Sequence, residues 1–184
     1  MAAIQLDKNG NAVGTSGADT ITGSNKTNIL DGRGGNDTIL GRGGHDLIDG
    51  FSGNDRIYGD GGNDILSGGA GQDTLTGGSG YDFFAFESKL SKTAVDTITD
   101  FSVKSDTILL WKKIFKVEAA ADGLISSDAF WIGSKAHDAS DRIIYNKSKG
   151  ALYYDPDGTG SKAAIQFATL AKNLKMTYQD FVVF

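Results

Sequence analysis

The sequence predicts an all-β protein: a flattened parallel β-roll followed by a mostly β C-terminal module. Three observations predict this fold class. Residues 14–85 form eight consecutive nine-residue repeats, each beginning with glycine. The eighth place of every repeat is a large apolar residue. From Tyr81 onward the composition changes, because 16 of the 18 aromatic residues lie at or beyond this position. We therefore expect an N-terminal cap and entry strand over 1–13, a roll over 14–86 and a capping module over 87–184.

Each repeat divides into a six-residue turn and a three-residue strand. The turn is rich in glycine and polar residues, which suits unusual backbone angles, and the strand has one apolar residue between two others. Seven of the eight copies carry Gly at the fourth place and Asp at the sixth. Two repeats would make one coil, so that repeats two apart stack. The apolar eighth places are Ile21, Leu30, Ile39, Ile48, Ile57, Leu66, Leu75 and Phe84.

The stacked turns predict a metal requirement. One buried aliphatic side chain per repeat is little apolar burial for nine ordered residues. Stacking also aligns like charges in two rows, namely Asp19, Asp37, Asp55 and Asp73 on one edge and Asp46, Asp64 and Asp82 on the other. A hard divalent cation takes oxygen ligands from carboxylates and backbone carbonyls, so its binding would supply folding free energy. The sequence thus predicts Ca²⁺, with about five to eight ions from the number of stacked turn pairs.

Two metal-free interpretations of the repeats are a flexible linker and a β-helix held by a packed core. A flexible glycine-rich linker would not keep an apolar residue at every eighth place. A metal-free β-helix would not need an acid at nearly every sixth place. Both patterns are present in this chain, and together they favour the calcium interpretation.

The repeats resemble the GGxGxDxUx nonapeptides of RTX proteins, a calcium-binding β-roll family of secreted bacterial toxins, proteases and lipases. The resemblance implies that sixth-place aspartates two repeats apart share an ion, and that carbonyls from the first four places complete its shell. The second repeat departs from the pattern with Lys26 at the fourth place and Asn28 at the sixth. This change removes one negative charge and adds one positive charge, so the resemblance does not decide whether Asn28 and Asp46 share an ion. The implied aspartate pairs are Asp19/Asp37, Asp37/Asp55, Asp55/Asp73, Asp46/Asp64 and Asp64/Asp82.

The resemblance also implies the backbone ligands. They occupy the first four places of the third to eighth repeats: Gly32, Arg33, Gly34, Gly35, Gly41, Arg42, Gly43, Gly44, Gly50, Phe51, Ser52, Gly53, Gly59, Asp60, Gly61, Gly62, Gly68, Gly69, Ala70, Gly71, Gly77, Gly78, Ser79 and Gly80. In the protease members, an acid just after the repeats and the first Asp of a DxIxDF block help to bind the last ion. The matching positions here are Glu87 and Asp96, at a wider spacing than usual.

Composition and charge restrict the possible partners and location. Residues 14–85 hold ten Asp and four Lys or Arg, so this block carries −6, and the remainder of the −5 chain carries +1. Without a basic footprint, nucleic acid is not an expected partner. No apolar run is long enough for a transmembrane segment. The first residues lack the basic start and apolar stretch of a cleaved signal peptide. The chain has no cysteine, so calcium would take the stabilising role that disulfides have in many secreted proteins.

The C-terminal half predicts strands separated by turns. Strands are expected at 81–88, 96–110, 128–133, 141–146, 151–155, 163–170 and 180–184, and a short helix at 111–123. This half also resembles the terminal module of proteins with haemolysin-type calcium-binding repeats. An acid followed by apolar residues ends the chain, from Asp180 to Phe184. That ending resembles the uncleaved signal for type I secretion, so the resemblance implies the type I secretion machinery as partner and an extracellular location.

Other motifs have simpler interpretations. Residues 155–160 resemble the opening of an EF-hand loop, but Gln166 stands where the bidentate Glu belongs, so a β-hairpin turn is favoured. His45 and His137 are isolated from any HExxH or triad motif and are expected on the solvated surface.

The expected function is a calcium-binding module that folds outside the cell and supports secretion and stability of a secreted bacterial protein, without enzymatic activity of its own. One alternative is the tail of a larger secreted protease, lipase, polysaccharide lyase or epimerase. The other is a surface-adhesion or glycan-binding module. Its candidate residues are Trp111, Trp131, Tyr153 and Tyr154, although core packing explains these aromatic residues more simply.

Overall fold

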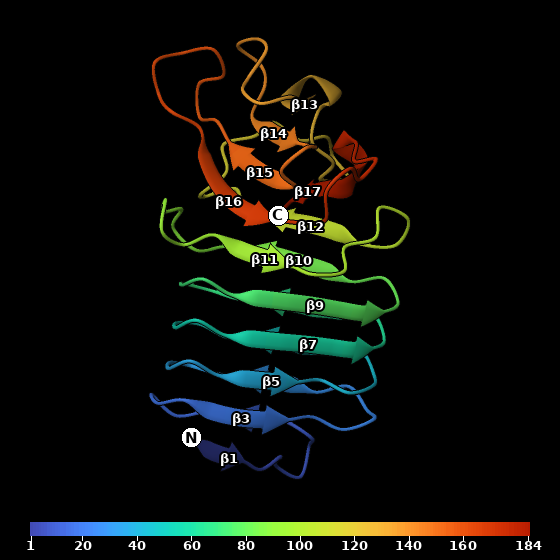
Figure 1. The fold of residues 1–184 in the computed structure, drawn as a ribbon. Helices are drawn as coiled ribbons and strands as arrows, with labels where there is room; N and C mark the ends of the chain where they lie inside the picture. Colours follow the sequence, from blue (N-terminus) through green and yellow to red (C-terminus); the bar gives the residue numbers. More distant parts are fainter.

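The nine-residue repeats fold into a roll of two facing parallel sheets, closed at one end by a C-terminal cap (Figure 1). This computed structural model describes residues 1–184. Sheet A has ten strands in the order β1-β3-β5-β7-β9-β11-β16-β15-β14-β13, and sheet B has seven in the order β17-β12-β10-β8-β6-β4-β2. Successive strands of the roll alternate between the sheets, as two strands per coil require.

The strands of the roll are short, and three residues is the commonest length. In sheet A they are β1 (Ala2–Ile4), β3 (Asp19–Thr22), β5 (Thr38–Leu40), β7 (Arg56–Gly61), β9 (Thr74–Ser79) and β11 (Asp96–Ile98). In sheet B they are β2 (Ala12–Val13), β4 (Ile29–Asp31), β6 (Leu47–Asp49), β8 (Ile65–Ser67), β10 (Phe83–Phe86) and β12 (Thr107–Leu110).

The register follows the coil length. Ile21 pairs with Ile39, and Ile39 pairs with Ile57, each 18 residues further on, so the eighth-place side chains form one buried column per sheet. All eight are at most 1 % exposed. Because each column is one side chain wide, the turns at the two edges lie close to the core, and their orientation is set by the strand register.

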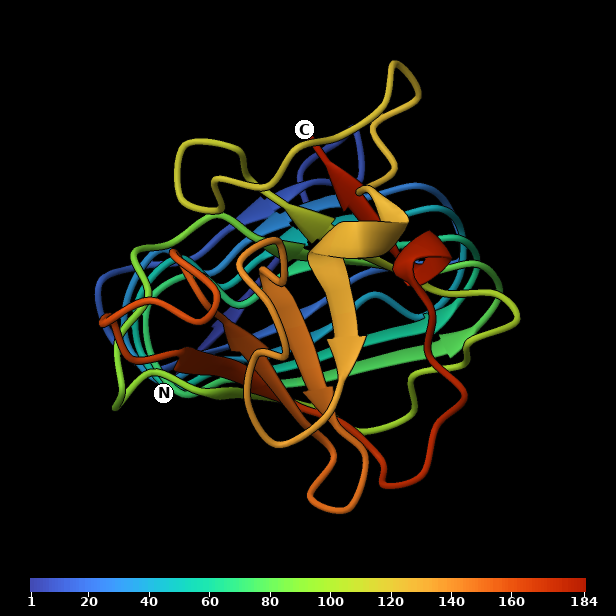
Figure 2. The same cartoon turned by 90° about the horizontal axis from the view of Figure 1, so that it is seen from above.

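The cap continues both sheets beyond the last repeat. β11 pairs with β9 and β12 with β10, both in parallel, so the roll gains one further coil outside the repeats. The remaining strands are β13 (Phe130–Ile132), β14 (Ile143–Asn146), β15 (Ala151–Tyr154), β16 (Ile165–Thr169) and β17 (Phe181–Val183), with 3₁₀ turns at Ser127–Ala129 and Tyr178–Asp180. The view along the roll shows these strands lying over the end of the coils (Figure 2).

Aromatic packing holds the cap together. Phe167 makes edge-to-face contacts with Phe86 and Phe115, with ring centroids 5.0 and 5.2 Å apart. The Tyr154 ring packs against Phe115, and its hydroxyl oxygen accepts the Lys116 N–H at 2.9 Å. Tyr154, one of the candidates for glycan contact, is therefore a core residue, whereas Trp131 is 38 % exposed.

The strands predicted from sequence are present, with one subdivision and one error. The expected strand at 96–110 is two strands, β11 and β12, joined by a turn on the second edge of the roll. The helix predicted at 111–123 is wrong: a single turn follows Trp111, and an Ala119–Ile125 bridge replaces further helix. Phe115 and Val117 are both buried, so every second side chain enters the core and an extended path is favoured over a helix. The chain contains no helix with the length and apolar character needed to cross a membrane.

Candidate metal centres

The sixth-place aspartates form two ladders, one on each edge of the roll. In each step, the backbone N–H of one Asp donates to Oδ1 of the Asp 18 residues later. The first edge links Asp19, Asp37, Asp55 and Asp73 in this way, at 2.7–2.8 Å. The second edge links Asn28, Asp46, Asp64 and Asp82, at 2.7–3.0 Å. One carboxylate oxygen of each ladder Asp is thus fixed by the stacked backbone.

Both ladders extend one step beyond the repeats. The Asp73 N–H donates to Asp96 Oδ1 at 3.0 Å, and the Asp82 N–H donates to Asp106 Oδ1 at 3.3 Å. Asp96 was predicted as a ligand, whereas Asp106 was missed. A sequence signal exists, because both residues begin the segment Asp-Thr-Ile found at 96–98 and 106–108, which keeps the order of a repeat's sixth to eighth places.

The second carboxylate oxygens of five ladder residues are buried and have no hydrogen-bond partner. No Lys or Arg compensates them, since the one ion pair within 4.0 Å in the molecule joins His137 to Asp138. Buried carboxylate oxygens normally have partners, so these five are the atoms of the ladders that are available to a cation. They are Oδ2 of Asp37, Asp55 and Asp73 on the first edge and of Asp46 and Asp64 on the second.

In the five repeats that have an unpartnered ladder oxygen, the first-place glycine lies beside that oxygen. A Cβ added at Gly32 would lie 2.7 Å from Asp37 Oδ2 and 3.0 Å from the Gly50 carbonyl oxygen. Gly41 is placed similarly, 2.5 Å from Asp46 Oδ2 and 2.8 Å from the Gly59 carbonyl. Carboxylate and carbonyl oxygens from two stacked turns therefore converge at a glycine. A hard cation such as Ca²⁺ prefers this donor set, so the residues present fit the metal that the sequence predicts.

Six turns share a backbone conformation that directs carbonyl groups inward. We call these the open turns; they comprise residues 32–37, 41–46, 50–55, 59–64, 68–73 and 77–82. Their second residue has positive φ even where it is not glycine, as at Arg33 (64°) and Phe51 (63°). At the fourth place, a Cβ on Gly53 would collide with the Gly35 carbonyl oxygen of the turn below. Side chains other than glycine rarely adopt positive φ, so these turns are strained in the way typical of ligand sites.

The ladder carboxyls are harder to ionise than usual. Burial raises the pKa of Asp55 to about 7, and the neighbouring charges of Asp73 and Asp37 add to the increase. Burial likewise raises the pKa of Asp73 to about 7 and that of Asp64 to about 6. At neutral pH the ladders therefore carry negative charge that is costly to keep, and a bound cation would offset this cost.

Three other turns are closed by their own side chains. In these closed turns, at 15–19, 24–28 and 102–106, the first residue carries a hydroxyl group. Its N–H donates to the side-chain oxygen four residues later: Thr15 to Asp19 Oδ2 (2.6 Å), Ser24 to Asn28 Oδ1 (2.6 Å) and Ser102 to Asp106 Oδ2 (2.8 Å). Its hydroxyl oxygen accepts the N–H two residues later, at 3.1–3.4 Å.

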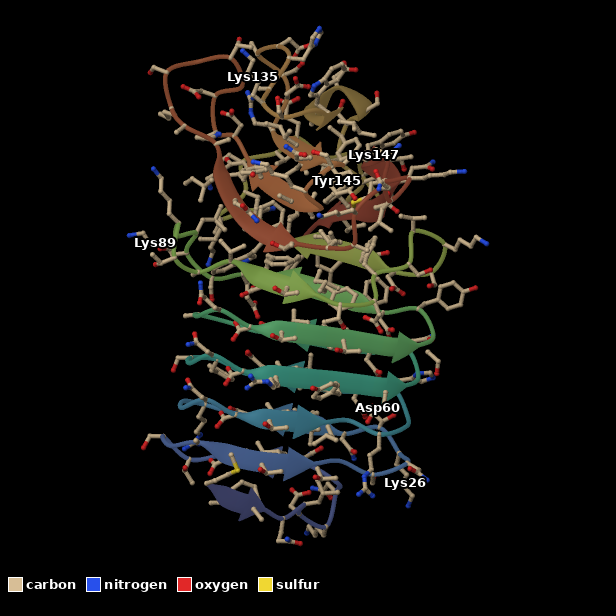
Figure 3. The ribbon with its side chains drawn as sticks, in the orientation of Figure 1. Lys26, Asp60, Lys89, Lys135, Tyr145 and Lys147 are labelled. Atoms are coloured by element: carbon tan, nitrogen blue, oxygen red, sulfur yellow. The ribbon has the colours of Figure 1, made fainter.

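The closed turns lie at the ends of the ladders. The first two precede the open turns and the third follows them along the chain. Lys26 in the second closed turn and Asp60 in an open turn lie on the same edge of the roll (Figure 3). Because Thr15 already holds the oxygen that is unpartnered in the open turns, Asp19 lacks a free buried ligand. The Asp19/Asp37 site stays a prediction.

His45 has a specific backbone contact. Four fifth-place side chains form an outer ladder in which each accepts the N–H of the fifth residue 18 positions later: Asn36, His45, Asn54 and Asn63. Asn36 accepts from Asn54 at 2.9 Å, and His45 Nδ1 accepts from Asn63 at 2.8 Å. His45 is exposed, as predicted for a solvated surface, and it also connects two open turns.

Glu87 and Asp96 line one small cavity next to the last coil of the first edge, with a volume of about 180 Å³. Glu87 Oε1 accepts the Ser67 hydroxyl at 3.2 Å, and Asp96 is 7 % exposed. Burial raises the pKa of Asp96 to about 6. Their shared role as ligands of the last ion stays a prediction that this placement allows.

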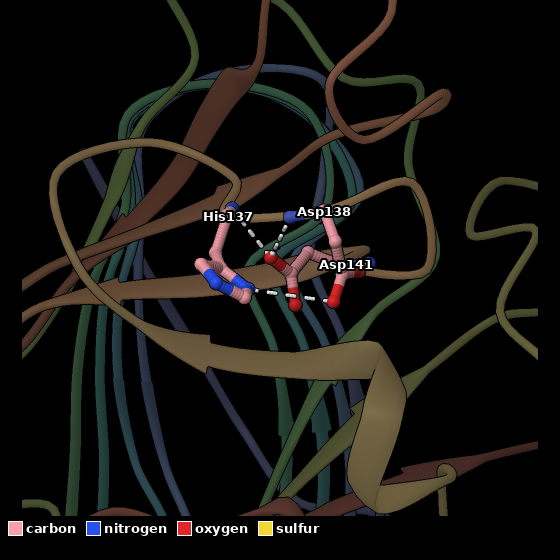
Figure 4. Close-up of side chains that lie close together, drawn as sticks. All are labelled: His137, Asp138 and Asp141. Atoms are coloured by element: carbon pink, nitrogen blue, oxygen red, sulfur yellow. Dashed lines mark hydrogen bonds and ion pairs between the residues drawn. The ribbon is translucent and has the colours of Figure 1, made fainter.

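His137, Asp138 and Asp141 place potential ligand atoms within 4.8 Å of one another in a loop of the cap (Figure 4). Loop closure accounts for their arrangement. Asp141 Oδ2 accepts the N–H groups of His137 and Asp138, and Asp138 Oδ1 accepts the N–H and hydroxyl of Ser140. The exposed His137 ring stacks on Trp131 with centroids 4.5 Å apart. The hydrogen bonds that close the loop therefore explain why these three side chains lie close together.

The fold and the stacked turns define a class of protein, the β-roll built from short repeats. Comparison with known families assigns the repeats more closely. Residues 13–48 and 49–84 each match the model of the RTX calcium-binding nonapeptide repeat (4 copies). The chain thus carries RTX haemolysin-type calcium-binding repeats, as its sequence predicted.

Comparison with whole proteins adds little to this assignment. A solved structure with some similarity is the solution structure of the AlgE6R3 subunit from the Azotobacter vinelandii mannuronan C5-epimerase. It is 21 % identical, with a TM-score of 0.44, over 92 % of this chain and 80 % of that one. A search of curated proteins found no match.

Proposed function

We propose that this chain is a calcium-dependent folding module of a secreted protein, and that it is not itself an enzyme. The observation that carries the proposal is the set of five buried carboxylate oxygens without partners, all in the open turns of a calcium-binding repeat. Calcium supplies positive charge and accepts several oxygen ligands at once. The residues of the chain do the rest: the strands set the spacing of the turns, and the N–H groups of the ladder fix the orientation of each carboxylate.

We assign one ion to each unpartnered oxygen, which gives five ions. Each lies between the turn that supplies the oxygen and the next coil on the same edge. The corresponding pairs are Asp37/Asp55, Asp55/Asp73, Asp73/Asp96, Asp46/Asp64 and Asp64/Asp82. Four of these are the pairs implied by the repeats, and the fifth includes the predicted ligand Asp96. Along the chain, the array begins after the closed turns at 15–19 and 24–28 and ends before the closed turn at 102–106. In those turns, groups of the chain itself bind the side-chain oxygens.

Dependence on calcium explains a secretory role. Without the ion, the two rows of ionised carboxylates oppose stacking, so the repeats stay unfolded where calcium is scarce. Outside the cell, where calcium is plentiful, binding drives folding of the roll and of the secreted protein that contains it. Passage through the type I secretion machinery in the unfolded state fits this sequence of events, with the terminal segment from Asp180 to Phe184 as the signal.

Calorimetric titration with Ca²⁺, followed by far-UV circular dichroism with and without chelator, tests the proposal. We expect about five ions per chain and a large loss of β signal when chelator is added. An unchanged spectrum in excess chelator would contradict calcium-dependent folding. Hydrolysis of protein, lipid or acidic polysaccharide by the isolated chain would contradict the non-enzymatic assignment, and it would leave the calcium sites unaffected.

A further inference from the structure

The last open turn on the second edge, at 77–82, is held by a side chain from outside the repeats. Asp100 Oδ1 accepts the Gly77 N–H at 3.0 Å, and Asp100 Oδ2 accepts the Gly78 N–H at 2.8 Å. Asp100 follows β11 along the chain, and its side chain is exposed and belongs to neither ladder. Both oxygens of this carboxylate are therefore used on a single turn of the roll.

A backbone carbonyl does the same work in an earlier turn of this edge. The Gly41 N–H donates to the Tyr58 carbonyl oxygen at 2.7 Å, one coil further along the chain. Beyond the turn at 77–82 the repeats end and the spacing changes, so the acceptor for Gly77 is a side chain 23 residues later. Asp100 thus replaces the main-chain acceptor at the point where the repeat pattern stops.

The main chain on both sides of Asp100 is anchored. The Thr99 N–H donates to the Leu75 carbonyl oxygen at 2.9 Å. Phe101 is 4 % exposed, and its ring packs against Phe84 with centroids 6.0 Å apart. The Asp100 carboxylate is therefore presented to the turn from a fixed position.

The Gly77–Gly78 peptide group connects Asp100 with a predicted calcium ligand. The chain has no cis peptide bond, so the Gly77 carbonyl and the Gly78 N–H point in opposite directions. With the N–H directed at Asp100, the carbonyl is directed away from it. The Gly77 carbonyl oxygen and Asp64 Oδ2 lie 2.6 and 2.5 Å from the point that a Cβ on Gly59 would occupy. Asp64 Oδ2 is one of the five unpartnered ladder oxygens.

From this geometry we propose that Asp100 is a positioning residue of the Asp64/Asp82 calcium site. Asp100 does not bind the ion; its two hydrogen bonds hold the Gly77–Gly78 peptide so that the Gly77 carbonyl oxygen faces the cation. A charged acceptor on the N–H side also polarises the peptide group and makes its carbonyl oxygen a better ligand. This inference rests on the proposed function, since it requires a Ca²⁺ ion at this site.

Residue-resolved NMR of the full chain, titrated with chelator-buffered Ca²⁺, tests the inference. We expect Asp100→Asn to raise the free Ca²⁺ concentration at half-saturation of the Gly77 carbonyl signal about tenfold. The reason is that an Asn side chain has one acceptor oxygen and cannot hold both N–H groups. The carbonyl signal of Gly50, which lies beside Asp37 Oδ2 on the first edge, should saturate at nearly the same Ca²⁺ concentration as in the unaltered chain.

Asp122→Asn is the matched control. Asp122 is an exposed acid of the cap whose Oδ1 accepts the Leu124 N–H at 3.1 Å. The substitution removes the same charge and the same kind of hydrogen bond, and it should move neither the Gly77 nor the Gly50 signal.

Two results of the titration would overturn the positioning role. A Gly77 midpoint that does not move in Asp100→Asn would show that Asp100 does not affect the site. Equal shifts of the Gly77 and Gly50 midpoints would show that Asp100 acts on the stability of the whole roll. The selective shift should also persist in about 1 M KCl, where the Debye length is about 3 Å; its loss there would mean that Asp100 acts only as a surface charge.

A measurement on the unaltered chain keeps the inference testable if Asp100→Asn does not fold. In the calcium-loaded chain, a scalar coupling across the hydrogen bond should join the Gly78 amide nitrogen to the Asp100 carboxyl carbon. Absence of that coupling would overturn the inference. Ladder signals that ignore Ca²⁺ in the unaltered chain would instead refute the proposed function, whereas identical calcium responses of the unaltered chain and Asp100→Asn would refute the role of Asp100 alone.

Discussion

The roll and the cap both bury aspartates, but they satisfy them in different ways. In the cap, Asp141 Oδ2 accepts two backbone N–H groups, and Asp180 Oδ2 accepts the Thr177 N–H at the 3₁₀ turn. In the open turns, Asp55 and its ladder neighbours leave one oxygen each without a donor. The core of the cap is rich in aromatic residues, whereas the roll has one column of single apolar side chains per sheet, aliphatic except for Phe84. The difference supports the proposed calcium dependence of the roll, because the cap binds these carboxylate oxygens with its own N–H groups and the open turns do not.

Removal of calcium should separate the two regions most strongly. We expect excess chelator to unfold the roll, because its carboxylates lose their counter-charge, while the hairpin of β14 and β15 keeps much of its protection through its aromatic core. Hydrogen exchange with and without chelator checks this by region. Equal loss of protection in the roll and in β14–β15 would show that the two regions fold as one unit.

Asp55→Ala should be the most damaging single substitution in the ladders. Asp55 receives the Asp37 N–H, serves two proposed ions, and lies in the middle of its edge. Loss of the carboxylate leaves that buried N–H without a partner, which alone costs about 1–3 kcal/mol, and it weakens both sites. Chemical unfolding in saturating Ca²⁺ measures the change in the free energy of unfolding. Asp19→Ala, in a closed turn, is the control and should cost less; an equal cost would mean that open and closed turns do not differ.

Acid should partly replace calcium in the roll. The folded pKa is about 7 for Asp55 and Asp73 and about 6 for Asp64, Asp82 and Asp96, all above the ordinary value of 3.8. The folded state therefore binds more protons than the unfolded state between these values. Without calcium, the destabilisation is complete above about pH 7, declines as pH falls through 7 and 6, and is gone below 3.8.

Circular dichroism of the calcium-free chain between pH 8 and pH 5 checks this expectation, with β signal rising as pH falls. The calcium-loaded chain is the control. There the same acidification should lower calcium affinity, because protons compete for the ladder oxygens. Loss of β signal from the calcium-free chain on mild acidification would contradict the prediction that ionised ladder carboxylates destabilise the roll.

Much of the difference between the roll and the cap could be predicted from the sequence. The eight apolar positions and the sixth-place acids predicted the strands, the register and the ladders, because a fixed period leaves few ways to stack. The closed turns were not predicted, because the repeat pattern gives the second place a role only through its backbone carbonyl and gives none to the side chains of Thr15 and Ser24. Their hydroxyl groups bind the backbone locally, a competition that a repeat pattern does not display. The helix at 111–123 failed for a related reason, since burial of Phe115 and Val117 outweighed local helix propensity.

Thr15→Gly should give the smallest change and the sharpest comparison of the turns. The first repeat already has Gly17 and Asp19 at the fourth and sixth places, so the Thr15 side chain is the feature that distinguishes it from an open turn. Glycine removes the hydroxyl bond to Asp19 Oδ2 and permits positive φ at the second place. With the backbone in the conformation of the open turns, the N–H of residue 15 would no longer donate to Asp19 Oδ2, and this oxygen would be free for a cation. We expect calorimetry to find one more ion per chain. Ser24→Gly is the matched control and should add none, because Lys26 and Asn28 remain in its turn. A gain in both variants, or in neither, would show that the second-place hydroxyl does not decide where the calcium array ends.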